Sequence, residues 1–196
     1  FLNLYQPFME IWVGKDLMLS FSIVICFVIY FYVYEVNQLL NTYKDAGGIW
    51  HTDRFRPLVT AIANFGMNII MVQFWGLYGI ILSTVLSMFL IGMPWLFHNL
   101  FTTMFEKKHM KQYIYSIAFY AIVSIFAGVI SVVICNFINF SLWVTLLIRF
   151  VICLIVPNII FLLVYNKKDE FKQSVLLVDK MTKGKITFLG KIAKSY

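Results

Sequence analysis

Residues 113–137 read YIYSIAFYAIVSIFAGVISVVICNF, and no charged side chain interrupts this run. An α-helix rises 1.5 Å per residue, so about 20 apolar residues cross the hydrocarbon core of a bilayer. Comparable runs lie at about 17–42, 57–74, 76–101 and 141–165. Lipid offers the backbone no hydrogen-bond partners, so these runs predict helices, and none shows the alternation of a barrel strand. We expect an all-α, polytopic transmembrane helix bundle with about five full spans.

The composition agrees with a membrane protein, because 61% of the residues are hydrophobic and only 13% are charged. The three cysteines lie inside apolar runs without C-x-x-C spacing, and the three histidines lack ligand spacing, so we expect no metal site. The chain shows no nucleophile paired with a base, no phosphate-binding glycine loop and no large outer loop. We therefore expect a protein that is not an enzyme and holds no cofactor.

The two ends of the chain differ from the middle. Residues 1–14 are apolar but too short to span, so we interpret them as the end of a truncated transmembrane helix and an outer loop. Residues 166–196 mix lysines with apolar residues, which predicts a basic amphipathic tail on the cytoplasmic membrane surface, with Gly184 between two short helices. A frayed, solvated tail is the alternative.

The basic residues lie on one side of the predicted spans. That side has Lys44, Arg54 and Arg56, then Lys107, Lys108 and Lys111, then eight lysines between positions 167 and 194, whereas the opposite side has only Lys15. Cytoplasmic loops collect lysine and arginine, so we expect a multi-pass protein of the cytoplasmic membrane with a cytoplasmic C-terminus. The net charge of +7 then reflects topology and contact with membrane lipids, and nucleic acid is not an expected partner.

Two charged residues lie well inside spans, Glu35 and Arg149. Ionisable groups at membrane depth are costly and tend to face protein or water, so they are the first candidates for function. Arg149 is roughly 12 Å from the outer end of its span by helical rise. It either faces a central cavity and meets an anionic substrate, or pairs with a helix outside this sequence.

Polar residues recur at helical spacing in two neighbouring spans. Tyr30, Tyr34, Asn37 and Asn41 share one face beside Glu35, and the next span carries Thr60, Asn64 and Asn68. Two such stripes predict a wet cavity, while the alternative is that the amides hydrogen-bond between helices. Small residues in the third span, Gly76, Gly79, Ser83, Thr84 and Ser87, predict close helix packing, and Pro157 predicts a kink in the last span.

The longest connection carries the most distinctive sequence: Asp45-Ala46-Gly47-Gly48-Ile49-Trp50, then Asp53-Arg54-Phe55-Arg56-Pro57-Leu58, followed by Asn64 and Asn68. This pattern resembles the bacterial polysaccharide flippases, which export O-antigen, capsular and exopolysaccharide repeat units. They belong to the multidrug/oligosaccharidyl-lipid/polysaccharide exporter superfamily. The similarity extends over about residues 1–105 and includes Pro7-Phe8, Ile11-Trp12-Val13-Gly14, Gly76-Leu77-Tyr78-Gly79-Ile80 and Ser83-Thr84.

The resemblance implies the second lobe of a two-lobe MATE-like transporter whose N-terminal lobe is missing here. Such a transporter moves undecaprenyl-diphosphate-linked oligosaccharide across the bacterial cytoplasmic membrane by alternating access, with glycan polymerisation and glycosyltransferase machinery as partners. The family motif does not assign residue roles, but charge and position suggest that Arg149 would meet the diphosphate. The sugars would meet the asparagines Asn37, Asn41, Asn64 and Asn68, with Tyr34 on the same substrate pathway. Glu35 would carry a proton, with H⁺ or Na⁺ as the coupling ion, and the fragment alone should not transport.

Alternatives remain for the loop and for the whole chain. Arg54 and Arg56 either contact substrate phosphates on the cytoplasmic side or serve topology alone, and Asp45 and Asp53 either pair with them or cap helices. The whole chain is alternatively a drug/cation antiporter of the same superfamily, or a non-transporting accessory subunit of a glycan assembly complex.

Overall fold

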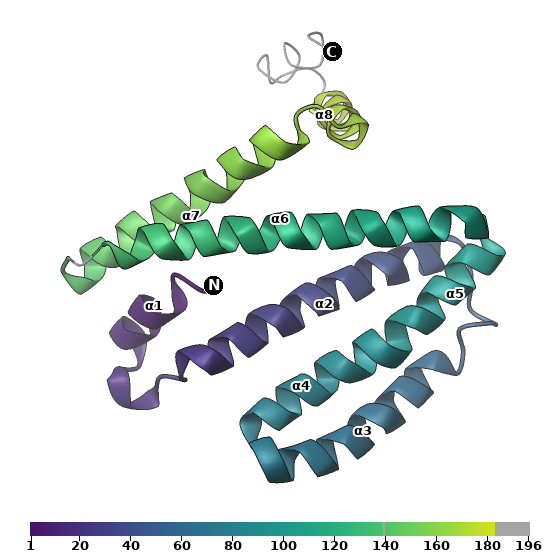
Figure 1. Cartoon of the computed structure of the whole chain (residues 1–196), viewed down its shortest axis with the longest axis horizontal. Helices are drawn as coiled ribbons and strands as arrows, with labels where there is room; N and C mark the ends of the chain where they lie inside the picture. Colours follow the sequence, from purple (N-terminus) through teal and green to yellow (C-terminus); the bar gives the residue numbers. More distant parts are fainter. Residues whose placement is uncertain (139, 183–196) are drawn as a thin grey trace. The chain divides into compact units, whose positions relative to one another are not determined.

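The computed structural model describes residues 1–138 and 140–182, and this part of the chain is helical throughout, without strands (Figure 1). The helices in chain order are α1 (Tyr5–Trp12), α2 (Phe21–Ala46), α3 (Arg56–Trp75), α4 (Leu77–Ser87), α5 (Met93–Thr103), α6 (Met110–Asn136), α7 (Leu142–Tyr165) and α8 (Asp169–Met181). Short 3₁₀ turns lie at Lys15–Leu17 and Lys107–His109, and a π-helical segment lies at Met88–Gly92.

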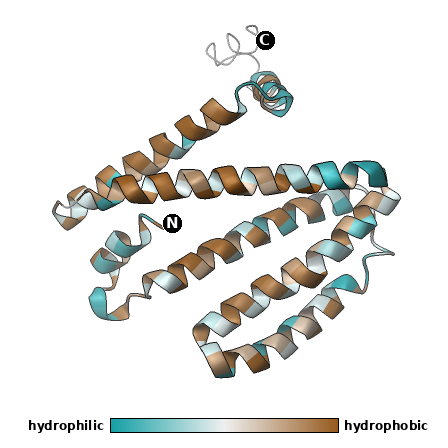
Figure 2. Cartoon of the chain, viewed as in Figure 1, coloured by the Kyte–Doolittle hydropathy of each residue, from teal (hydrophilic) through white to brown (hydrophobic). Residues whose placement is uncertain are grey.

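Five helical stretches are long and apolar enough to cross a membrane: Phe21–Ala46, Arg56–Trp75, Leu77–Thr103, Lys107–Asn136 and Leu142–Tyr165. Figure 2 shows hydrophobic residues along the length of each. The predicted all-α fold and multi-pass membrane character are confirmed. The first span is shifted from the predicted 17–42, because Leu17 belongs to a 3₁₀ turn and the helix continues through Tyr43–Ala46, which includes the charged Lys44 and Asp45.

The chain divides into two compact units, Phe1–Ala121 and a second unit that begins at Ile122 within α6. In the first unit α4 packs against both α2 and α3, and α5 packs against α2. We call the end of this unit that carries Lys44 and Arg56 its basic end. The core lies toward the basic end and consists of Leu40, Ile49, Met93, Leu96, Leu100 and Phe101. The second unit contains the rest of α6 together with α7 and α8. On its part of α6, Val123, Ala127, Ser131 and Cys135 form one buried face.

Two glycines shape the hairpin between α3 and α4. Gly76 joins the helices with a φ of 53°, a conformation that glycine adopts without strain. At Gly79 a Cβ atom would lie 2.2 Å from the carbonyl oxygen of Met71, so only glycine fits where the two backbones meet. Ser83 and Ser87 continue the same face and are fully buried. The predicted close packing of this small-residue face is confirmed.

The third span, Leu77–Thr103, is not a uniform α-helix, which the sequence pattern did not predict. Its turn at Met88–Gly92 is π-helical, and Pro94 follows two residues later. Proline has no N–H to donate and its ring clashes with the preceding turn, so the wider turn accommodates it. By contrast, α7 runs continuously through Pro157, and the Asn158 side chain donates a 2.6 Å bond to the carbonyl of Leu154.

The tail contains one described helix, α8, with acidic residues in its first turn and Lys180 in its last, as the helix dipole favours. The second tail helix predicted beyond Gly184 lies outside the described residues.

Candidate functional site

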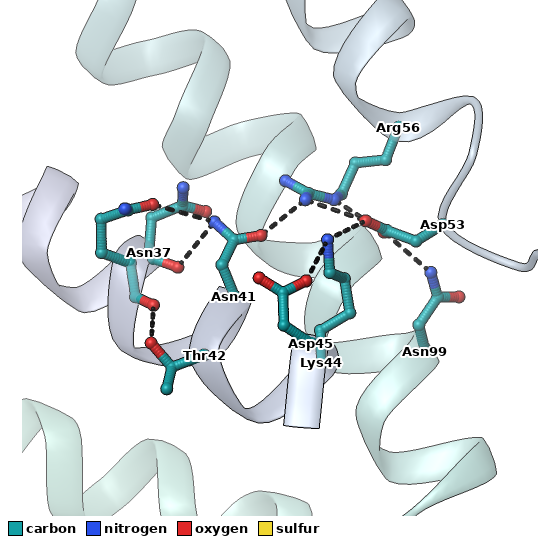
Figure 3. Close-up of polar contacts among 9 residues, drawn as sticks. Asn37, Asn41, Thr42, Lys44, Asp45, Asp53, Arg56 and Asn99 are labelled. Carbon is teal, nitrogen blue, oxygen red and sulfur yellow. Dashed lines mark hydrogen bonds and ion pairs between the residues drawn. The ribbon is translucent and has the colours of Figure 1, made fainter. Parts of the chain in front are cut away.

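A group of buried charged and polar side chains joins the C-terminal parts of α2 and α5 to the N-terminal end of α3 (Figure 3). We call Lys44, Asp53, Arg56 and Asn99 the charge network. Asp53 is its centre, because Arg56 donates to both carboxylate oxygens, from Nε at 2.7 Å and from Nη2 at 2.9 Å. Asn99 of α5 donates to Oδ1 at 3.1 Å. Lys44 Nζ lies 3.6 Å from Oδ2.

The charge network extends into α2 through Arg56 and Lys44. Arg56 Nη2 donates a 2.7 Å bond to Asn41 Oδ1, and Asn41 in turn donates to the carbonyl of Asn37 at 3.0 Å. Lys44 Nζ lies 3.0 Å from Asp45 Oδ1 and 4.5 Å from the ring centroid of Trp50. These contacts fix the chain between α2 and α3 against both helices.

Burial shows what the charge network does. Asp53 is 3% exposed, Asn99 5%, Arg56 7% and Lys44 8%. Removing charges from water is expensive and is offset only where the groups pair and hydrogen-bond well. Here one carboxylate faces two cations and an amide donor, so the arrangement satisfies its own members. It holds three helix ends together, which is a structural task.

The four charged residues predicted in the loop therefore separate into two environments. Asp53 and Arg56 are buried partners, as one of the two alternatives for the loop carboxylates supposed. Asp45 lies at the edge with a half-exposed side chain. Arg54 is exposed, and its guanidinium carbon lies 4.6 Å from the ring centroid of Phe55. Contact with a substrate phosphate stays a prediction for Arg54, while the contacts of Arg56 favour a structural role.

The polar stripe of α3 faces α4. Ser83 Oγ lies 3.0 Å from Asn68 Oδ1 and 2.8 Å from the carbonyl oxygen of Ile80, which share its single proton, and Asn64 Nδ2 lies 3.5 Å from Thr84 Oγ1. Thr60 lies beside the π-helical segment, where a Cβ atom on Gly92 would be 3.7 Å from its side chain. These contacts are those of amides and hydroxyls that hold two helices together. They favour the packing interpretation for Asn68, whereas Thr60 Oγ1 and Asn64 Oδ1 are buried without a hydrogen-bond partner in the described residues.

The polar stripe of α2 is different, because part of it faces away from the protein. Glu35 and Tyr34 are exposed, and no basic side chain of the described residues pairs with Glu35. Asn37 is buried, yet its Oδ1 atom has no hydrogen-bond partner within the part of the chain that the structure describes. We call the exposed Tyr34 and Glu35, with the buried Asn37 next to them, the open polar face of α2.

Arg149 lies on α7 in the second unit and is half-buried, whereas Glu35 belongs to the first unit. No group of three or more possible metal ligands occurs among residues 1–138 and 140–182.

Sequence reasoning missed Lys44 and Asn99 as site residues. Asn99 is an amide within a span, the same signal that drew attention to Asn64 and Asn68, but it stands alone without a periodic stripe. Lys44 was used only as evidence for the cytoplasmic side of the membrane. Its position one residue before Asp45 could have indicated a role in the loop.

Comparisons of this chain with protein-family models, with curated proteins and with solved structures found no match.

Proposed function

We propose that this chain forms one lobe of a membrane exporter of undecaprenyl-diphosphate-linked oligosaccharide repeat units. The lobe would work by alternating access in the bacterial cytoplasmic membrane and serve polysaccharide biosynthesis. The observation that carries the proposal is the open polar face of α2, and the loop resemblance from residue 45 to residue 58 supports the choice of substrate class.

The open polar face lies within the length of a helix that is long and apolar enough to cross a membrane. Glu35 is seven residues before Thr42, where the predicted apolar run ends, or about 10 Å along the helix axis. A carboxylate at that depth is expensive against acyl chains and tends to face a water-filled cavity or another protein surface. Tyr34 adds an exposed phenol, which is a suitable partner for sugar hydroxyls, and Asn37 adds a buried amide oxygen without a partner in the described residues.

The remaining polar residues have complementary tasks under this proposal. Arg149 of α7 would bind the diphosphate, since guanidinium groups bind phosphate in a bidentate manner. Glu35 would exchange the coupling proton. Asn64 and Asn68, which bond to α4, would contribute to the stability of the lobe and less to the sugar path than the sequence suggested.

The loop residues that carry the resemblance have structural tasks that suit such a transporter. Gly48 adopts a φ of 65°, Pro57 lies in the first turn of α3, and Asp53 and Arg56 belong to the charge network. Alternating access rocks packed helices as rigid bodies around a site near the bilayer midplane. A buried network that fixes three helix ends is a means of keeping one lobe rigid.

The direct test deletes the reading frame that encodes this chain from its host and measures surface polysaccharide. We expect polysaccharide to be lost and lipid-linked repeat units to accumulate, with recovery when the reading frame is restored on a plasmid. Arg149→Ala should fail to restore polysaccharide while the variant still inserts into the membrane, and Lys15→Gln serves as the matched control.

Two results would contradict the proposal. Normal polysaccharide in the deletion strain would exclude export of its repeat units. Increased susceptibility to cationic drugs with unchanged polysaccharide would favour the antiporter instead.

A further inference from the structure

A cavity of about 390 Å³ opens in the first unit, and its lining residues come from the ends of α2 and α5, the segment after α5 and the first turns of α6. We call it the basic-end cavity. Its floor consists of Leu40, Leu100 and Phe101, and its walls include the rings of Tyr43, Phe105 and Tyr113. This volume falls in the range of pockets that bind small ligands, roughly 300–1,000 Å³.

The interior of the basic-end cavity is apolar and preformed. Leu40 and Leu100 are 1% exposed and Phe101 is 5% exposed, so the floor belongs to the core of the unit. Ring contacts hold the walls in place: the Phe101 and Phe105 centroids are 5.5 Å apart, and those of Phe101 and Tyr113 are 5.8 Å apart. Tyr43 meets Phe105 edge-on at 6.1 Å. Such walls suit a hydrocarbon ligand.

The rim is polar: Glu106 is the charged residue that lines it, and lysines of the adjoining segment flank the lining residues in the sequence. Glu106, His109 and Gln112 line the opening, and the segment 106–111 also contains Lys107, Lys108 and Lys111. Lys108 pairs with Glu106, and both side chains are more than two-thirds exposed. Three lysines and one glutamate give this segment a formal charge of +2 with histidine neutral. An anionic group at the opening would therefore be attracted.

The opening of the cavity, with its apolar interior and polar rim, lies where membrane-spanning stretches end. Three membrane-spanning stretches end or begin beside it, at Ala46, Thr103 and Lys107. Tyrosine rings near span ends and lysines just beyond them are typical of the level of lipid headgroups. The molecules that present a long hydrocarbon chain and an anionic phosphate at this level are membrane lipids.

We propose that the basic-end cavity binds one acyl chain of an anionic phospholipid, whose phosphate contacts the lysines of segment 106–111. The bound chain fills the space between α2, α5 and α6 and links the three helices. This site is separate from the open polar face of α2, so it does not depend on the proposed export activity.

Native mass spectrometry of the purified full chain tests the lipid site. The detergent-solubilised protein is titrated with phosphatidylglycerol, and in parallel with phosphatidylcholine of the same acyl chains. We expect one phosphatidylglycerol to be retained, and retained at least about fivefold more strongly than phosphatidylcholine, since a lysine near a charged surface contributes about that factor.

Two variants separate the two parts of the site. Lys108→Gln with Lys111→Gln should lower phosphatidylglycerol retention about 10-fold or more and leave phosphatidylcholine unchanged. Lys172→Gln with Lys180→Gln on α8 is the matched charge control. Ser116→Phe, which places a ring in the cavity, should abolish retention of both lipids. Its control is Ser22→Phe, at an exposed position near the start of α2.

Gln112→Phe, at the exposed edge of the cavity, repeats the filling test if Ser116→Phe does not fold, which circular dichroism would reveal. Equal retention of the two lipids would overturn the phosphate contact. Undiminished retention in a folded cavity-filled variant would overturn the acyl-chain site. Protection from thermal unfolding by maltose, without any effect of phospholipid, would assign the aromatic walls to a sugar instead.

Discussion

Asp53 and Glu35 are two carboxylates of the same unit in opposite surroundings. Asp53 is 3% exposed and meets Arg56, Lys44 and Asn99, each from a different segment. Glu35 is exposed on a membrane-spanning helix and has no basic partner among the described residues. Asp53 lies at the end of the bundle, whereas Glu35 lies within the length of a span.

Asp53 is a charged group that stabilises the fold through its partners, whereas Glu35 is an exposed charged group with no basic partner among the described residues. A buried ion that is fully paired contributes to structure, and removal of one of its partners strongly destabilises the fold. An ionisable group left open at membrane depth stabilises nothing in the described unit, so its cost points to a task outside it. Changes at Asp53 should therefore lower stability, whereas changes at Glu35 should lower export and leave stability nearly unchanged.

The largest effect on stability is expected for Asp53→Ala. The change leaves Arg56 and Lys44 buried without their shared carboxylate, which typically costs about 3–5 kcal/mol. We expect the free energy of unfolding in detergent, measured by denaturant titration of the purified chain, to fall by this amount. Asp45→Ala is the control, because its half-exposed ion pair is worth at most about 1 kcal/mol. Equal losses in both variants would show that the charge network is not a unit.

A smaller loss is expected when the amide donor of the network is removed. In Asn99→Leu the carboxylate of Asp53 keeps both cations but loses one donor, and a hydrogen bond to a charged group is worth about 1.5–3 kcal/mol. The double variant with Asp53→Ala should lose less than the sum of the single losses, since both changes act on one network. Strict additivity would mean that Asn99 stabilises α5 independently of Asp53.

The five spans could be predicted because length and apolar character alone determine whether a helix crosses a bilayer. The pairing of Asp53 with Asn99 could not, because 46 positions separate them and only the packing of α5 against α2 brings them together. The π-helical segment could not be predicted either, because a helix can accommodate Pro94 by a kink or by a wider turn, and tertiary packing determines which one forms.

Periodicity placed the polar residues on helix faces but did not determine which neighbour each face meets. Asn37 and Asn68 occupy similar stripes in sequence, yet Asn68 bonds to Ser83 of α4 while Asn37 Oδ1 has no partner in the described residues. The sequence therefore predicted one cavity lined by two stripes, whereas the contacts separate Asn68, which pairs with α4, from Asn37; Thr60 Oγ1 and Asn64 Oδ1 also have no partner in the described residues.

This separation predicts a small effect for Asn68→Val. Interhelical polar contacts in membranes average about 0.6 kcal/mol, and the Ser83 hydroxyl keeps its 2.8 Å bond to the carbonyl of Ile80. In a double-variant cycle with Ser83→Ala, we expect a coupling energy of about that size between Asn68 and Ser83. We expect normal export in the complemented deletion strain. A variant that is fully stable but inactive would return Asn68 to the sugar path.

The smallest effect on stability, and a large one on function, is expected for Glu35→Gln. The two side chains are nearly the same size, and no described ion pair is broken, so the free energy of unfolding should change by less than about 0.5 kcal/mol. Glutamine cannot exchange a proton. Polysaccharide export should therefore fall at least about tenfold, equivalent to about 1.4 kcal/mol, and the remainder should no longer depend on external pH. Glu106→Gln, a second exposed carboxylate that lies at the edge of the membrane, should leave export unchanged. If Glu35→Gln exports normally but unfolds more easily, Glu35 is a structural residue like Asp53, and the open polar face loses its role in the proposed transport path.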